Sequence, residues 1–339
     1  MYNLTINDYD HLVYEKELKN FLPEHIIDFH AHIGKKEFEY VGKSNGGSTW
    51  TRCLDEELLA EDLAKTYQLL FPQNKMTPLI FGDCIHRIDQ VNAYVQETGR
   101  DYNWPTLYRT SFDIPADRLE AEIKAGGFLG IKPYLSFCPP YIPDNEIRIY
   151  DFLPKEHLEV ANRNGWIIML HIPRSSRLRD PVNLAQLMEI EANYPDVKLI
   201  VAHIGRAYSK EDIGNAFDLL KQTKNMYFDF TANLCDDAIK ACIEAMGCNR
   251  LLFGADLPIA AMRMYRIVEN GIYYNVVPSG LYGNVANEPH MRESNEESIT
   301  LMIYEQLRAF KRCAVELKLS DHEIETILYG NANKILERR

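Results

Sequence analysis

The stretch Ile26-Ile27-Asp28-Phe29-His30-Ala31-His32 decides how the rest of this sequence of 339 residues is interpreted. The apolar pair Ile26-Ile27 begins a β-strand, and side chains two positions apart on a strand point the same way. His30 and His32 are therefore predicted to project together from the end of one strand. Two imidazoles in this arrangement can bind one cation if other strand ends supply further ligands.

Seven more short apolar runs follow, separated by stretches with helical periodicity. This alternation is typical of βα units around a parallel sheet, and eight such strands predict a (β/α)8 TIM barrel. A doubly wound open sheet is the alternative, but its usual Gly-rich turn is absent after the first strand. The expected strands are 26–30, 78–82, 107–112, 129–135, 166–171, 198–203, 226–230 and 250–255, and the expected helices between them are 56–70, 87–98, 116–125, 154–164, 181–193, 211–223 and 235–246.

Two segments fall outside this alternation. Residues 34–54 form a long Gly-containing loop after the first strand, and residues 271–295, rich in Gly, Asn, Pro and Tyr, follow the eighth. Both are expected over the C-terminal face of the barrel, either as a lid or as plain surface insertions. Whether Trp50 or His290 reaches the site from them stays open. Helices at 296–317 and 321–328 are expected to close a single domain, 1–339, a distorted barrel with extra C-terminal helices.

Composition excludes several classes of protein. A net charge of −12 argues against nucleic-acid binding and against anionic membrane surfaces. The seven Cys are odd in number and lack a Cys-x-x-Cys pair, which indicates a reduced, intracellular protein. No signal peptide is evident at the N-terminus, and no run approaches the ~18 apolar residues of a membrane helix. We therefore expect a cytoplasmic protein.

Metal-capable residues recur where the expected strands end. They are His30 and His32 on the first strand, His171 on the fifth, His203 on the sixth and Asp256 just after the eighth. In a barrel these positions converge at one mouth. Imidazole nitrogen with one carboxylate suits Zn²⁺, with Mn²⁺, Fe²⁺ or Ni²⁺ possible. A lone His at a strand end is more often a hydrogen-bonding residue, but four of them with an Asp predict a metal site. The remaining histidines, apart from His290, are expected at the surface: His11, His25, His86, His157 and His322.

The order of short motifs along the chain resembles the metal-dependent hydrolases of the amidohydrolase superfamily. Within it, the pattern is similar to the amidohydrolase-2 branch, which includes aminocarboxymuconate-semialdehyde decarboxylase. Each motif alone is weak, whereas the series covers most of the chain. The motifs are IDFHAH at 27–32, GFLGIK at 127–132, VAHIGR at 201–206, FGADLP at 253–258 and YGNAN at 329–333.

The resemblance implies a barrel with a single divalent cation, usually Zn²⁺. It also implies that His203 acts as an acid/base or holds the substrate beside the metal. Many superfamily members bridge two metals with a carboxylated Lys on the fourth strand; Lys132 lies there, but in this branch that Lys generally does not bridge. Lys132 is therefore expected either to contact a substrate anion or to be structural. The implied metal ligands are His30, His32, His171 and Asp256.

Arginines cluster just after two of the strand ends. Arg174, Arg177 and Arg179 follow the fifth strand, and Arg206 follows the sixth. Arg binds carboxylate or phosphate with two parallel hydrogen bonds, so a small anionic substrate is predicted. Arg174 and Arg206 are the expected contacts, whereas Arg177 and Arg179 are expected to pair with acidic helices. Tyr134 is expected to stack on or hydrogen-bond a substrate ring, and a homodimer is possible.

Three functions remain open from the sequence. The first is hydrolysis of an ester, lactone or amide by a metal-activated water, with Asp256 or His203 as the general base. The second is a non-oxidative decarboxylation of an aromatic or unsaturated acid on the same residues. The third is a metal sensor without catalysis, which an intact ligand set with an acid/base His disfavours. Hydrolysis is the preferred interpretation.

Overall fold

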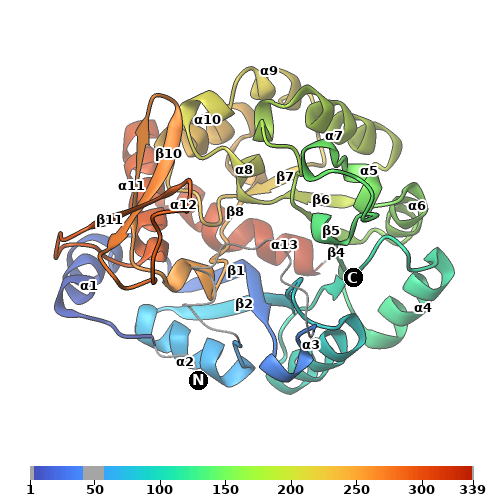
Figure 1. The fold of residues 1–339 in the computed structure, drawn as a ribbon, viewed down its shortest axis with the longest axis horizontal. Helices are drawn as coiled ribbons and strands as arrows, with labels where there is room; N and C mark the ends of the chain where they lie inside the picture. Colours follow the sequence, from blue (N-terminus) through green and yellow to red (C-terminus); the bar gives the residue numbers. More distant parts are fainter. Residues whose placement is uncertain (1–3, 41–56, 338–339) are drawn as a thin grey trace.

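The computed structural model describes residues 4–40 and 57–337, and within them eight parallel strands lie inside a layer of helices (Figure 1). Every strand expected from the sequence is present, several of them shorter than predicted. Trp50, Cys53 and most of the expected 34–54 loop lie outside the described residues. The strands are β1 (His25–Ile33), β2 (Lys75–Gly82), β3 (Tyr108–Arg109), β4 (Gly130–Lys132), β5 (Ile167–Leu170), β6 (Lys198–Val201), β7 (Tyr227–Asp229) and β8 (Leu251–Leu252).

The strands follow one another in sequence order around a distorted ring. Strands β3 to β8 form one parallel sheet, and β1 pairs with β2 in another. A parallel bridge between Ile80 and Thr106 joins the two sheets on one side. On the other side Ala31 bridges Leu257, and the Phe29 N–H donates to the Phe253 carbonyl at 2.9 Å. These links give the predicted (β/α)8 architecture, without a continuous ladder at the two joins, and exclude the doubly wound alternative.

The helices pack their apolar faces on the outside of the strands. Helix α7 starts at Pro181 as predicted, because the Asp180 carboxylate accepts hydrogen bonds from the backbone N–H groups of Val182 and Asn183 at 2.9 and 3.3 Å. Helix α9 is much shorter than the expected 211–223. The helices are α1 (Asp8–Val13), α2 (Ala60–Leu70), α3 (Ile88–Tyr102), α4 (Ala116–Gly126), α5 (Ile149–Phe152), α6 (Lys155–Asn164), α7 (Pro181–Asn193), α8 (His203–Arg206), α9 (Ala216–Leu220), α10 (Asp236–Met246), α11 (Met302–Leu317), α12 (Asp321–Glu325) and α13 (Asn331–Glu337).

The interior of the ring is a packed apolar core. Ala332 and Ile335 of α13 pack against this core, so the last helix covers one end of the barrel. The C-terminal ends of the strands are left to form the other end, where polar side chains replace apolar ones. The interior strand residues are Ile27, Phe29, Leu79, Phe81, Leu107, Ile167, Met169, Ile200, Ala202 and Leu252.

The segment after β8 is more regular than expected. In place of an irregular 271–295 loop, the chain forms a three-stranded sheet of β9 (Tyr265–Glu269), β10 (Ile272–Pro278) and β11 (Met291–Ser294). Tyr, Val and Ile favour extended backbone, and their abundance here was the missed signal. Helix α11 consequently begins at Met302 rather than at residue 296.

Two findings bear on the expectations drawn from composition. In the described ranges, no helix is long and apolar enough to cross a membrane. The six cysteines within those ranges are free thiols, in agreement with the absence of a disulfide framework.

Candidate metal centre

Five of the residues singled out in the sequence meet at the C-terminal ends of the strands. This histidine cluster consists of His30, His32, His171, His203 and Asp256. Two subsets of it have ligand atoms that all lie within 4.8 Å of one another: His30 with His171 and His203, and His30 with His32 and Asp256. His30 belongs to both subsets and is fully buried, so it is the centre of the cluster.

Local irregularities bring His30 into this position. The pairing register of β1 with β2 shifts between Asp28 and Ala31, and such a bulge re-aims the side chains beside it. The His30 ring thereby lies 5.2 Å from the ring of Phe81, a residue of the barrel interior. Gly254 leaves room for the His30 side chain, since a Cβ at position 254 would lie only 2.6 Å from His30 Cβ.

The distances around Asp256 fit donors that share one ion. Its Oδ1 lies 3.0 Å from His32 Nε2 and 3.7 Å from His30 Nε2. With bonds of ~2.1 Å, two donors on one cation lie ~3.0 Å apart at a right angle, ~3.4 Å apart at the tetrahedral angle and ~3.6 Å apart at ~120°. Imidazole nitrogens with one carboxylate oxygen are also the donor set that borderline divalent metals prefer. The residues therefore fit a divalent metal ion.

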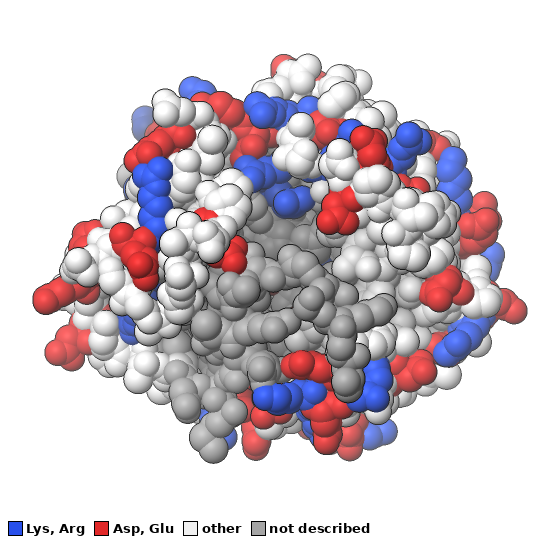
Figure 2. Space-filling model, in the orientation of Figure 1, with Lys and Arg blue, Asp and Glu red and all other residues white. Residues whose placement is uncertain are grey.

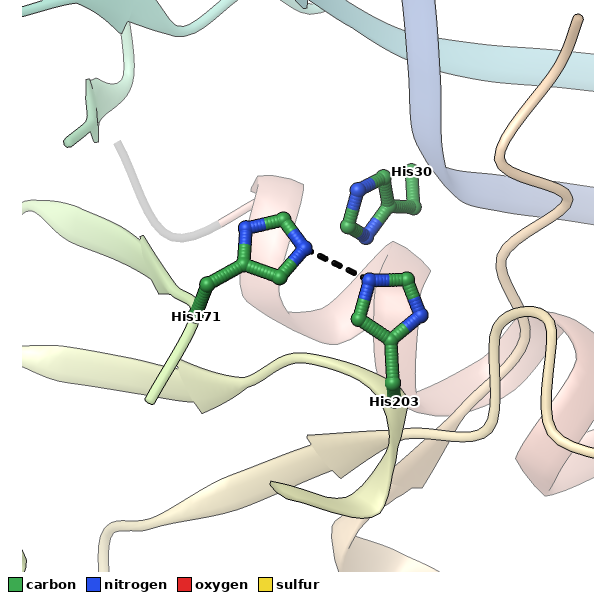
Figure 3. A group of neighbouring side chains, drawn as sticks. All are labelled: His30, His171 and His203. Carbon is green, nitrogen blue, oxygen red and sulfur yellow. Dashed lines mark hydrogen bonds between the residues drawn. The ribbon is translucent and has the colours of Figure 1, made fainter. Parts of the chain in front are cut away.

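His171 and His203 approach each other more closely than two ligands of one ion would. Their Nε2 atoms are 2.6 Å apart, and Figure 3 shows both rings converging with that of His30. His203 Nδ1 lies 2.8 Å from the Thr231 carbonyl, which can only accept, so that nitrogen carries the hydrogen. Nε2 is therefore the His203 nitrogen that faces the cluster, and it lies too close to His171 Nε2 for both atoms to bind one ion.

The backbone is strained at both polar ends of the site. His203 has a φ of 58° and Asp256 a φ of 57°, in the left-handed region that non-glycine residues rarely adopt. The turn after β6 is held by Asn233, whose amide donates to the carbonyls of His203 and Ala207 at 3.1 and 3.0 Å. Such strain costs of order 1–3 kcal/mol per residue and concentrates at functional sites.

The sequence model of the amidohydrolase family matches residues 27–338. The chain belongs to this family. Among proteins with curated descriptions, no sequence matches it. The two bounds of the match fall on β1, where the cluster begins, and just beyond α13, so the family pattern spans the whole barrel.

Solved structures share the fold of this amidohydrolase at low sequence identity. A probable 2-pyrone-4,6-dicarboxylic acid hydrolase from Acinetobacter baumannii, with citric acid bound, has a TM-score of 0.58 and 15% identity, covering 91% of this chain and 98% of that chain. A zinc-bound amidohydrolase from Burkholderia multivorans has a TM-score of 0.60 and 14% identity, with 91% and 98% coverage. A dihydroxybenzoic acid decarboxylase from Polaromonas sp. JS666, with manganese and 2-nitroresorcinol bound, has a TM-score of 0.55 and 14% identity, with 93% and 97% coverage.

Electrostatics keep the ligand atoms of this amidohydrolase in the forms that bind metal. Burial, and then the neighbouring Lys132 ammonium, hold the pKa of both His30 and His171 well below the usual range. Burial alone would raise the pKa of Asp256, but the hydrogen bond from His32 and the nearby imidazoles hold it below its ordinary value. Neutral imidazoles and an ionised carboxylate at neutral pH are the ligand forms that a divalent metal requires.

Lys132 and Tyr134 lie against the cluster rather than in open space. Lys132 is fully buried, with its Nζ 3.4 Å from His30 Nε2, and burial lowers its pKa to about 7. The Tyr134 hydroxyl donates to the Gly82 carbonyl at 3.0 Å and lies 3.2 Å from His32 Nδ1. Both side chains therefore support metal-capable histidines directly, and their predicted contact with substrate stays a prediction.

The arginines after β5 and β6 differ in whether they pair with a carboxylate. Arg174 donates to the Asp180 carboxylate at 3.1 Å. Arg177 forms an ion pair with Asp212 at 2.6 Å, as expected of it. Arg206 donates from Nη1 to the backbone carbonyls of Ile172 and Pro173, at 3.4 and 3.1 Å. Figure 2 shows Lys and Arg atoms near the position of α8, the element that carries Arg206.

His290 directly precedes β11 of the sheet added after β8. Its ring stacks on that of Tyr273, with centroids 4.2 Å apart, and its Nδ1 lies 2.9 Å from the Tyr273 carbonyl. Within the described ranges it belongs to neither group of potential metal ligands. The sheet geometry thus gives His290 a packing role.

Two histidines expected at the surface are buried, which corrects that prediction. His157 of α6 faces inward, and its Nε2 lies 2.7 Å from the Ile114 carbonyl. His86 is 3% exposed, and both of its ring nitrogens lack hydrogen-bond partners in the part of the chain that the structure describes. Their helical or loop context predicted exposure, whereas in the folded chain both rings are buried.

His86 belongs to a second polar group at the ends of β2 and β3 that sequence reasoning missed. This Arg109 cluster consists of Asp83, Cys84, His86 and Arg109. Arg109 is fully buried and donates from Nη1 to the His86 carbonyl, while its guanidinium carbon lies 4.2 Å from the centre of the Phe137 ring. Its Nε and Nη2 atoms have no hydrogen-bond partner among the described residues. An Arg ending a buried strand was the available sequence signal.

Proposed function

We propose that this amidohydrolase is a metal-dependent hydrolase that acts on a small anionic ester, lactone or amide. The observation that carries the proposal is the convergence of four imidazoles and one carboxylate at the strand ends, two subsets of which have ligand atoms within 4.8 Å of each other. A structural metal site would be closed by its ligands, whereas a catalytic site keeps further donors beside an open position.

His30, His32, His171 and Asp256 would hold the ion, most plausibly Zn²⁺. When bound, such an ion makes a water nucleophilic at neutral pH and polarises a substrate oxygen. The zinc-bound and manganese-bound relatives support a divalent metal for this chain. Asp256 is the second candidate for the general base; its pKa below the ordinary value keeps the carboxylate ionised at neutral pH and makes it a weak base.

His203 would move the proton. Its Nδ1–H is committed to the Thr231 carbonyl, so the only site for proton exchange is Nε2, which points at His171 and the cluster. At 2.6 Å the Nε2 atoms of His171 and His203 are too close for both to bind one ion, which leaves His203 outside the ligand set. His203 therefore suits the role of general base toward water and general acid toward the leaving group.

Two arginines would hold the anionic end of the substrate. Arg206 hydrogen-bonds only carbonyl oxygens in the described structure. Arg109 carries two buried nitrogens without partners, and a buried cation without an anion is costly. A substrate carboxylate would accept hydrogen bonds from the guanidinium of either Arg206 or Arg109. Arg174 is a weaker candidate, because Asp180 already occupies its guanidinium.

Decarboxylation of an aromatic or unsaturated acid is the alternative, favoured by the dihydroxybenzoate decarboxylases among the structural relatives. There, His203 would protonate the carbon that loses CO₂. A panel of anionic lactones, esters and amides and a panel of aromatic acids, tested with metal-loaded protein and its His203→Asn variant, separates the two. Acid release without CO₂ supports the hydrolase, CO₂ release supports the decarboxylase, and no turnover on either panel rejects both.

A further inference from the structure

Asp229, at the end of β7, is fully buried and uses both carboxylate oxygens on the histidine cluster. Its Oδ2 lies 3.1 Å from His30 Nδ1. Its Oδ1 accepts hydrogen bonds from the backbone N–H groups of His203 and Thr231 at 2.7 and 3.2 Å. One side chain thus contacts the ring of one cluster histidine and the strained backbone of another.

The contact fixes which nitrogen of His30 is available. A carboxylate can only accept, so His30 Nδ1 carries the hydrogen and Nε2 keeps its lone pair. His30 Nε2 lies 3.4 Å from Lys132 Nζ and 3.7 Å from Asp256 Oδ1, and His30 belongs to both groups of converging ligand atoms. Without a partner at Nδ1, the neutral ring would be free to adopt the opposite tautomer, in which Nε2 cannot bind a metal.

We propose that Asp229 is a positioning residue that holds His30 in the Nδ1–H tautomer and keeps His203 in its left-handed backbone conformation. The inference rests on the proposed metal site and goes beyond it, since it assigns metal affinity to a residue that would not touch the ion. Partners of this kind typically change metal affinity ~10–100-fold when removed.

Asp28 provides a matched comparison on the other side of His30. It is also fully buried, and its Oδ1 accepts from the backbone N–H groups of His30 and Ala255 at 2.9 and 2.8 Å. Its Oδ2, however, accepts from the Tyr67 hydroxyl at 2.5 Å and not from an imidazole. Asp28 therefore shapes the backbone of the site without selecting a tautomer.

The same substitution should act differently at the two positions. In Asp229→Asn, the two backbone N–H groups keep the amide oxygen on their side, so the NH₂ group faces His30 Nδ1 and donates to it. His30 is then forced into the Nε2–H form. In Asp28→Asn, the NH₂ group faces the Tyr67 hydroxyl, whose oxygen can accept.

The test measures Zn²⁺ affinity of the full chain by competition with a chromophoric chelator, together with the His30 tautomer by ¹⁵N-histidine NMR of the metal-free protein. We expect Asp229→Asn to bind Zn²⁺ ~10–100-fold more weakly with His30 in the Nε2–H form, while Asp28→Asn stays within about threefold of the wild type. Equal affinities in wild type and Asp229→Asn would overturn the inference.

The NMR measurement keeps the two proposals separable. A wild-type protein that binds no Zn²⁺ contradicts the metal site, whereas its His30 tautomer still reports on Asp229. If Asp229→Asn fails to fold, the wild type alone decides, because a His30 ring in the Nε2–H form would rule out the assigned role.

Discussion

The histidine cluster and the Arg109 cluster are neighbouring polar groups at the same end of the barrel, yet they differ in how completely their buried atoms are paired. All four ring nitrogens of His30 and His203 contact a polar partner at 3.4 Å or less. In the Arg109 cluster, both ring nitrogens of His86 and two guanidinium nitrogens of Arg109 are buried without partners within the described ranges.

This difference indicates different roles for the two clusters. The paired atoms of the histidine cluster are preorganised, whereas the unpaired donors of the Arg109 cluster can bind a ligand. The first group is held in one arrangement by Asp229, Thr231 and Lys132, as a reacting centre requires. The second retains buried donors without hydrogen-bond partners in the described structure, which costs stability. Proteins accept such costs mainly where function uses the groups, which is why Arg109 enters the proposed function as an anion contact.

The largest expected effect comes from disturbing the paired group without removing a ligand. His203→Asn should retain the metal and lose ~10²–10⁴-fold in kcat, the usual contribution of a general acid–base group. Metal content by elemental analysis and turnover on the active substrate panel provide the check. Full turnover in the variant would remove His203 from the reaction.

The pH dependence of stability tests the burial of His86 in the Arg109 cluster. Burial lowers the pKa of His86 to about 4, below its ordinary value of 6.5. Between these values the unfolded chain binds the proton and the folded chain does not, so stability is present above about pH 6.5 and is lost as pH falls toward 4. The contribution is up to roughly 3 kcal/mol.

Urea unfolding of the metal-free protein at pH 7 and pH 4.5 measures this loss. His86→Gln should show a smaller loss than the wild type, while His30 and His171 continue to contribute to the remainder because their pKa values are also lowered by burial. An unchanged pH dependence in His86→Gln would show that His86 is not buried as described.

Removing the Arg109 charge should weaken substrate binding and stabilise the fold. Arg109→Met is expected to raise Tm by roughly 1–3 °C, because it replaces a buried cation by an apolar chain, and to raise KM for an anionic substrate ~10-fold. Arg118→Met is the matched control, since Arg118 lies exposed on α4 beside Glu122. A lower Tm with unchanged KM would make Arg109 structural.

The smallest effect is expected at Arg174. Because Asp180 holds its guanidinium at 3.1 Å, Arg174→Ala should change KM by less than about threefold, whereas Arg206→Ala should raise it by ~10-fold. Steady-state kinetics on both variants tests the order. A larger effect at Arg174 would mean that its pairing with Asp180 opens when substrate binds.

The sequence predicted what depends on local pattern and missed what depends on long-range pairing. Apolar runs followed by His or Asp located the strand ends, and the parallel barrel then placed those residues together. Asp229 was missed because its partner His30 lies 199 positions away. An Asp between Phe228 and Phe230 in a buried strand nevertheless demands a polar partner, and that was the available signal.

The arginines show a similar limit. Asp180 is close enough in sequence to suggest pairing with Arg174, but only the turn geometry decides that the two side chains meet. The Arg in the expected strand 107–112 was a signal that a polar group would be buried, but the lack of partners for two of its nitrogens is a property of the folded environment. The Tyr-rich strands after β8 carried a local signal that the glycines and prolines obscured.

Elemental analysis of the purified, unchelated protein tests the central claim most directly, with a His30→Ala/His32→Ala variant analysed beside it. The account predicts about one Zn²⁺ or similar divalent ion per wild-type chain and its loss from the variant. No metal in either protein, even after reconstitution with Zn²⁺ or Mn²⁺, would contradict the account and with it the proposed chemistry.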